Sequence, residues 1–248
     1  MSSSRSRLLL LAALALGCAP RANASAPAPS LDEVTLTPLT EGVWVHTTWA
    51  RLASGLFSSS GLLVCSHGVG LLVDTAWNDA QTERLLALAD ARECPVRALV
   101  VTHFHNDRMG GIGAVLRRGV ATYAYRETVT RAQLPSWSPT VLDSPGEVRV
   151  GNVTAEVFFP GEAHTPDNVV VWLRDARTLF GGCMVRARSW SSLGNVADAN
   201  LAAWPASARA LVERYGSQAA HVVPGHGEPG DASLLSHTLT LAEAARPR

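Results

Sequence analysis

The chain has 248 residues, of which 47% are hydrophobic, so it is long enough for one sizeable packed core or two small ones. This apolar content argues against a disordered chain. Acidic and basic residues balance at 21 each, and a neutral net charge argues against nucleic acid as a partner. Every basic residue is arginine, because the sequence contains no lysine.

Residues 1–24 predict a secretory signal peptide. Two arginines precede an apolar run at residues 8–16 that is too short for a membrane span, and small residues follow. Cleavage after Ala24 would release the chain into the periplasm, with a linker over residues 25–30. The alternative is a lipoprotein signal that ends before Cys18, which would carry a lipid anchor at the outer membrane. We favour simple export and expect a monomer without a membrane span.

The first half of the chain alternates strand and helix patterns. Strand-like runs bounded by turn residues cover residues 34–40, 42–48, 61–65 and 68–75. Residues 78–93 carry apolar side chains at helical spacing, so they predict a helix. A buried strand at 97–103 and a short helix at 110–119 follow, an order typical of a layered α/β fold.

The second half repeats this theme. Strands are predicted over residues 153–160, 168–173 and 178–185. Helices are predicted over 201–216 and 234–246, on either side of a last strand and turn at 221–227. No linker interrupts the pattern, so we expect one domain over 31–248, built from two similar α/β halves.

Three cysteines lie beyond the leader, at Cys65, Cys94 and Cys183. An odd number in an exported chain leaves at least one thiol for metal binding or reactivity. Spacing alone leaves open whether Cys65 pairs with Cys94, and we prefer the interpretation that both are buried free thiols.

Residues that could bind a metal recur where predicted strands end. They lie in VTHFHNDRMGG (101–111), GEAHTPDN (161–168), GGCMV (181–185) and VPGHG (223–227). Strand ends are rigid and open onto loops, so side chains from separate strands can converge at one edge of a sheet. Imidazole, thiolate and carboxylate are the ligands that zinc prefers. A lone H-x-H pair is weak evidence, but the joint occurrence predicts a metal site.

These motifs together resemble the class B metallo-β-lactamases of the first, di-zinc subclass. The matching segments, in the family's order, are DTAW (74–77), HFHNDRMGG (103–111), AHTPDNVVVWL (163–173), GGCMV (181–185), LGNVADANLAAWP (193–205) and VVPGHGEPG (222–230). The resemblance implies an α/β fold, a four-layer αββα sandwich, with a metal groove along one edge of the two sheets.

The resemblance also implies two Zn²⁺ ions per chain. The first would be held by His103, His105 and His164, and the second by Asp107, Cys183 and His226. It implies hydrolysis of β-lactams (penicillins, cephalosporins and carbapenems) by a metal-bound hydroxide without an acyl-enzyme, and hence antibiotic resistance. Asp107 would also orient the nucleophile. Arg108 is expected to hold Asp107, Asp74 or backbone carbonyls beneath the metals, and its alternative is a surface arginine at a helix start.

Many family members place a lysine three residues after the ligand cysteine, where it binds the lactam carboxylate. Here that position is Arg186, and Arg188 is the alternative. Arginine can bind a carboxylate through two parallel hydrogen bonds, so the role is chemically satisfied.

Three further residues are expected at the substrate. Asn195 matches an asparagine that donates to the lactam carbonyl oxygen, and Trp77 matches an aromatic residue beside the groove. Phe57, with Trp49 as a weaker choice, lies in the segment 47–61 that matches a flap over the groove.

Two other functions remain open from the sequence. A thioesterase of the glyoxalase II type typically reads H-x-H-x-D-H, whereas this chain has Arg108 at the last position and Cys183 where a bridging aspartate is expected. A non-catalytic periplasmic zinc-binding protein would have a saturated coordination shell and no residue to anchor a substrate. Arg108 and Cys183 both favour the β-lactamase over the thioesterase.

Overall fold

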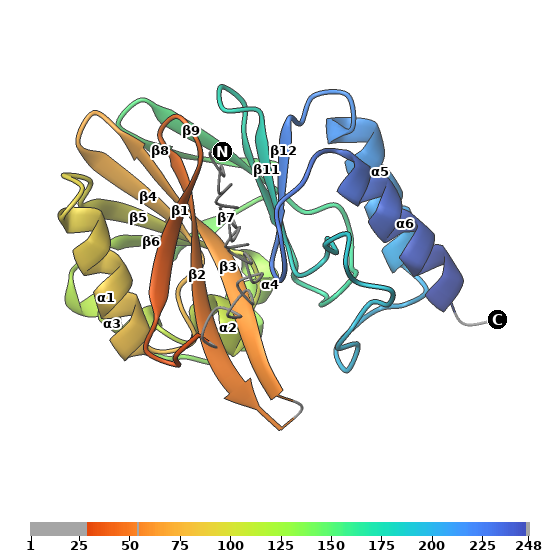
Figure 1. The fold of residues 1–248 in the computed structure, drawn as a ribbon, viewed down its shortest axis with the longest axis horizontal. Coiled ribbons are helices and arrows are strands. Elements are labelled where there is room, and N and C mark those ends of the chain that lie inside the picture. The colour runs from red at the N-terminus through yellow and green to blue at the C-terminus, as the bar shows by residue number, and fades with distance from the viewer. Residues whose placement is uncertain (1–28, 54, 247–248) are drawn as a thin grey trace, which may run out of the picture.

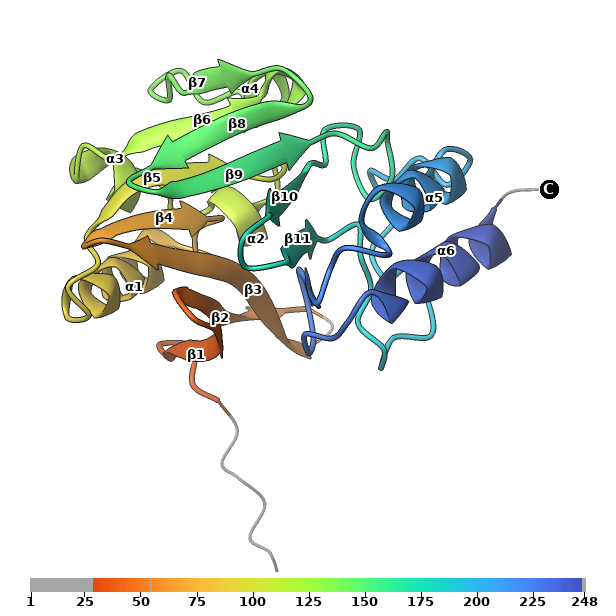
Figure 2. The same ribbon diagram turned by 90° about the horizontal axis from the view of Figure 1, so that it is seen from above.

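The computed structural model describes residues 29–53 and 55–246, so the predicted signal peptide and Cys18 lie outside the described residues. Two β-sheets pack face to face, and helices cover the outer face of each sheet (Figures 1 and 2). This is the αββα sandwich that the sequence predicted. Within the described ranges, no helix is both long and apolar enough to cross a membrane.

The first sheet has seven strands that neighbour one another in chain order. They are β1 (Val34–Thr40), β2 (Val43–Leu52), β3 (Gly55–Ser66), β4 (Val69–Val73), β5 (Val96–Val101), β6 (Ala121–Tyr125) and β7 (Thr140–Leu142). The pairs from β1 to β4 are antiparallel, and those from β4 to β7 are parallel.

The second sheet has five strands in the order β12-β11-β10-β9-β8. They are β8 (Gly146–Val150), β9 (Val153–Phe158), β10 (Val170–Leu173), β11 (Thr178–Gly182) and β12 (His221–Pro224). Only β11 and β12 run parallel, and the other neighbours pair antiparallel.

Alternation along the strands sends side chains to two different cores. Leu62 lies between the sheets with Val171 of the other sheet, whereas its neighbour Leu63 faces outward to the helices. Because successive strand residues point to opposite faces, a strand that is buried on both faces must be apolar throughout. The run GLLVC of β3 and the VVWL segment that forms β10 meet that requirement.

Six helices within the described residues complete the layers. They are α1 (Asp79–Asp90), α2 (Asn106–Met109), α3 (Ile112–Arg117), α4 (Arg126–Ala132), α5 (Trp204–Tyr215) and α6 (Ser233–Ala245). The Asn78 side chain caps α1 by accepting from the Gln81 N–H at 2.9 Å. Pro205 stands in the first turn of α5, where its missing N–H costs nothing.

No helix or strand was predicted over residues 121–150, and one hairpin is longer than predicted. Strands β6, β7 and β8 and helix α4 have no counterpart among the predicted elements. The predicted strands at 42–48 and 61–65 belong to one long hairpin, in which β2 pairs with β3 from Val43–Val64 to Leu52–Gly55. The flap over residues 47–61 is therefore the extended end of this hairpin, visible at the bottom of Figure 1.

The preference for free thiols at Cys65 and Cys94 is wrong, because the two form a disulfide. Cys65 lies near the end of β3, and Cys94 lies in the turn between α1 and β5. Their Cα atoms are 5.8 Å apart although 29 positions separate them in sequence. The spacing of two cysteines says nothing about this approach, which depends on how β3, β4 and β5 pair.

We predict that replacing both cysteines, as Cys65→Ser with Cys94→Ser, lowers the free energy of unfolding by about 3 kcal/mol, because the bond closes a long loop in the unfolded chain. Thermal unfolding of the oxidised parent and of the double variant measures this difference. A reductant should lower the midpoint of the parent and leave that of the variant unchanged; equal midpoints for oxidised parent and variant would contradict the prediction.

Candidate metal centre

Strand ends and the loops beside them bring the predicted ligands together. β5 ends at Val101, and the HFH segment leads into α2, a single turn that carries Asp107 and Arg108. His164 lies between β9 and β10, Cys183 directly follows β11, and His226 follows β12. The ligands therefore come from both sheets and meet at one edge of the sandwich.

Three imidazoles form the first cluster. The rings of His103, His105 and His164 stand edge to face, with centroids 4.9, 5.0 and 5.2 Å apart. One ligand atom of each lies within 4.8 Å of the others. His103 Nε2 is buried without a hydrogen-bond partner in the described part of the chain, a costly state for a lone pair unless a cation binds it. The arrangement fits a metal ion with three imidazole ligands and an open position.

Asp107, Cys183 and His226 form the second cluster. Asp107 Oδ2 lies 3.2 Å from Cys183 Sγ and 3.1 Å from His226 Nε2, and the last two atoms are 3.3 Å apart. His226 Nδ1 donates to the Ser58 carbonyl at 2.6 Å, so Nδ1 carries a proton and Nε2 faces the cluster. Carboxylate, thiolate and imidazole together suit zinc.

The two clusters are contiguous. One ligand atom each of His103, Asp107 and Cys183 also lies within 4.8 Å of the others, and His103 Nε2 is 3.9 Å from Asp107 Oδ1. A cation in either cluster would therefore have the other cluster as its immediate neighbour, as in a two-metal site.

Burial and charge set the protonation of the ligands. Burial holds the pKa of His103 well below its ordinary value, and burial followed by the charge of Arg186 lowers the pKa of His164 to about 3. Both are thus neutral at pH 7, the form that binds metal. For His226, burial opposes the charge, but Cys183 and Asp107 outweigh it and raise the pKa to about 10. The second cluster therefore favours positive charge at its centre.

Arg108 lies beneath the second cluster and is fully buried, so the alternative of a surface arginine is wrong. Its Nε and Nη2 donate to Asp107 Oδ2 at 3.0 and 2.8 Å, and its Nη1 donates to Asp74 Oδ2 at 3.3 Å. Nη1 and Nη2 also donate to the carbonyls of Ser60 and Gly225. Burial opposes ionisation of Asp107, but Arg108 together with His226 and His103 outweighs burial and holds the pKa of this carboxyl well below its usual range.

Gly225 brings the two sheets together at this point. Its carbonyl accepts from Ser60 N at 2.9 Å, and its N–H donates to the Gly182 carbonyl at 2.8 Å. A Cβ at this position would lie 2.7 Å from Cys183 Sγ and 2.8 Å from Cys183 N. Only glycine lets the backbone pass this close to the thiol.

A cavity of about 600 Å³ opens directly onto the clusters. The predicted substrate residues Phe57, Trp77, Arg186 and Asn195 all line it, together with Trp190. Most of its exposed lining is apolar, with polar groups at a few positions, as in small-molecule sites.

Arg188 does not line this cavity. Its Nη2 donates to Ser233 Oγ at 2.7 Å, and it borders a different hollow beside α6. Trp49 also lies outside the cavity lining and contacts α1 through its carbonyl, which accepts from Gln81. The geometry therefore favours Arg186 over Arg188, and Phe57 over Trp49, as residues within reach of a bound molecule.

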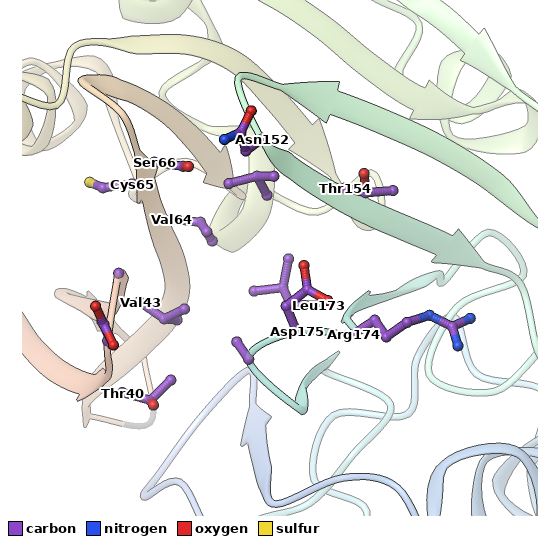
Figure 3. A pocket seen from close by; sticks show the side chains of 14 residues that line it. Thr40, Val43, Val64, Cys65, Ser66, Asn152, Thr154, Leu173, Arg174 and Asp175 are labelled. Carbon is purple, nitrogen blue, oxygen red and sulfur yellow. The ribbon is translucent and has the colours of Figure 1, made fainter.

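A second hollow, of about 390 Å³, lies between the sheets beside the other end of β3 (Figure 3). Val64, Ser66, Asn152, Leu173 and Arg174 are among the residues around it. No candidate ligand is among the described residues that line it, so it is separate from the metal centre.

Comparison with known proteins identifies the family. The model of the metallo-β-lactamase superfamily matches residues 53–226. The chain belongs to this superfamily. A relative, the metallo-β-lactamase type 2 of Bacillus cereus, is 36% identical over 211 residues, which are 84% of this chain and 82% of that protein.

Solved metallo-β-lactamase structures agree in fold. The DIM-1 enzyme exposed to ceftazidime is 37% identical, with a TM-score of 0.81, and the match covers 88% of this chain and all of that one. The mono-zinc form of FIM-1 from Pseudomonas aeruginosa is 36% identical, with a TM-score of 0.78, and the match covers 86% and 97% of the two chains. The protein is thus a class B metallo-β-lactamase by sequence and fold.

Two aspartates of this metallo-β-lactamase that contact the HFH segment were not predicted from the sequence. Asp198 Oδ2 lies 2.9 Å from His105 Nε2, and because a carboxylate accepts, the ring's Nδ1 keeps the free lone pair. Asp167 Oδ2 accepts from the Phe104 N–H at 2.9 Å, between the two HFH histidines. Both lie inside motifs quoted above, but spacing alone does not show which polar neighbour reaches a ligand.

We predict that Asp198→Asn lowers the zinc affinity of the first cluster about tenfold, because the amide oxygen can still accept from His105 but no longer makes the imidazole more basic. Competition with a chromophoric chelator measures the affinity. Asp175→Asn, at an exposed aspartate beside the second hollow, is the matched control. Equal affinities in the parent and both variants would refute the role.

Proposed function

We propose that this protein hydrolyses the amide bond of β-lactam antibiotics with two bound Zn²⁺ ions. The observation that carries the proposal is the pair of contiguous ligand clusters at the floor of an open cavity whose lining includes a buried cation, Arg186. The family supports it, since relatives are metallo-β-lactamases and neighbours include an enzyme exposed to ceftazidime and one in a mono-zinc form.

The donor atoms suggest how two ions would be shared. His103, His105 and His164 would hold one, and Asp107, Cys183 and His226 would hold the other. Zinc when bound supplies a Lewis acid and lowers the pKa of water to about 7. The thiolate and carboxylate of the second cluster offset more of the ion's charge than three neutral imidazoles can.

The protein's own side chains would orient the lactam. Arg186 is the cation available for its carboxylate, and Asn195 can donate its amide N–H to the lactam carbonyl oxygen. Trp77 and Phe57 give the cavity apolar walls that exclude water from the reacting bond. Asp107, fixed by Arg108, can accept a hydrogen bond from the attacking water and so orient it.

The cavity lining supports hydrolysis without an acyl-enzyme. Among the described residues that line it, none has a hydroxyl or thiol group that could attack the carbonyl. Cys183 is buried against Asp107 and His226 and does not line the cavity. Inhibitors that acylate a serine should therefore find no target here.

The thioesterase alternative has less support. It requires a metal ligand at position 108, and the Arg108 side chain is used entirely by Asp107, Asp74 and two carbonyls. An inert zinc-binding protein is equally disfavoured, because a closed site would not border a cavity of about 600 Å³. We further propose action on penicillins, cephalosporins and carbapenems, export to the periplasm and a monomeric state.

We predict that purified zinc-loaded protein hydrolyses a cephalosporin and a carbapenem but not a glutathione thioester. A chelator should abolish the hydrolysis and added zinc should restore it, because the clusters have no other source of water activation. Absorbance assays on the three substrates, with and without chelator, measure this. Chelator-sensitive cleavage of the thioester without lactam hydrolysis would overturn the proposed function.

A further inference from the structure

Arg186 is a buried cation with unpaired donors. The residue is 3% exposed, and its Nε and Nη2 are buried without a hydrogen-bond acceptor among the described residues. Burial lowers the pKa of this guanidinium to about 10. A buried charge is costly unless something compensates for the lost water.

The charges of Cys183 and Asp107 offset part of this cost, and two indole rings face the guanidinium directly. The guanidinium carbon of Arg186 lies 5.1 Å from the ring centroid of Trp190 and 5.4 Å from that of Trp204, over both rings. Cations over aromatic faces at this distance are attracted by the ring quadrupole, more strongly when water is excluded. A ring face accepts no conventional hydrogen bond, so it holds the cation and leaves the N–H groups free.

The two rings differ in how they are held. Trp204 is fully buried in α5, and its Nε1 donates to the Met184 carbonyl at 3.2 Å. Trp190 is half-buried, lines the cavity, and follows Arg186 by four residues in the loop after β11. Its carbonyl lies 2.9 Å from His237 Nε2, which fixes the loop to α6. Trp190 is therefore the ring that could be changed without opening the core.

Close packing fixes the Trp190 ring. A Cβ on Gly194 would meet this ring at 2.5 Å, and a Cβ on Gly227 would lie 3.5 Å from its Nε1. Both glycines have positive φ, of 68° and 84°. The chain thus uses two glycines to let the indole pack tightly beside the Arg186 guanidinium.

We propose that Trp190 is a positioning residue, which holds the Arg186 guanidinium through its ring face so that the part of this cation that lines the cavity awaits the carboxylate of the substrate. The proposal rests on the proposed function. It implies that this protein gains more binding energy from a substrate carboxylate than a solvated arginine would provide, because the carboxylate supplies a charged acceptor to a cation that has lost its water. Lactams whose carboxylate is esterified should bind poorly.

The test compares Trp190→Phe with Trp190→Leu, which are similar in volume but differ in having a ring face. We expect Trp190→Leu to raise KM about 3- to 10-fold for a carboxylate-bearing cephalosporin, with kcat changed less than about twofold, and Trp190→Phe to keep most of the parent KM. The methyl ester of the same cephalosporin should show no such difference between the variants.

A double-mutant cycle separates action through Arg186 from direct contact with substrate. In an Arg186→Ala background, Trp190→Leu should leave KM unchanged, because the cation that the ring holds is gone. The same KM increase in both backgrounds would overturn the proposal, as would equal KM values for Trp190→Leu and Trp190→Phe.

A measurement without lactams keeps this proposal distinct from the proposed function. Phenylglyoxal modifies accessible guanidinium groups, and mass spectrometry of the Arg186 peptide in the zinc-loaded protein gives the rate. We expect Trp190→Leu to speed modification several-fold relative to Trp190→Phe. Equal rates would overturn the role of the ring face even in an active enzyme. Failure of lactam hydrolysis in the parent would refute only the proposed function.

Discussion

The metal centre depends on the hydrogen bonds that the fully buried Arg108 guanidinium makes. Its hydrogen bonds reach Asp107 in α2, Asp74 after β4, the Ser60 carbonyl of β3 and the Gly225 carbonyl after β12. A buried charge is costly unless its donors are satisfied with good geometry, and this planar fork satisfies them with partners from both sheets. One side chain therefore fixes the seam between the sheets and orients the Asp107 carboxylate.

The arrangement of the strands in the sandwich brings the metal ligands together beside Arg108. Strands β5, β11 and β12 end at the same edge, so the loops that follow them carry histidine, thiol and carboxylate groups into contact. Both faces of the central strands are covered, by the opposite sheet and by helices, which makes these strand ends rigid. The ligands need no large loop movement to converge, because the pairing of the strands already places them.

The sequence predicted what depends on local pattern and on residue type. The order of most strands and the grouping of the HFHND segment with His164, Cys183 and His226 follow from apolar runs that end in potential ligands, whereas the four-layer sandwich was implied by the resemblance to the family. Prediction from the sequence failed for features that depend on contacts between distant parts of the chain. The Cys65–Cys94 bond and the contact of Asp198 with His105 are set by how strands and loops pack. Strands β6 to β8 were missed because they are short and partly exposed, so their apolar pattern is weak.

We propose that the Arg108 fork builds the second metal position by holding Asp107. Native mass spectrometry of folded Arg108→Lys protein under a zinc titration tests it most directly. Lysine keeps the charge but cannot make the same set of hydrogen bonds to Asp107, Asp74 and two carbonyls. We expect the variant to retain one tightly bound ion, at the three histidines, and to lose tight binding of the second. Two ions bound as tightly as in the parent would contradict it.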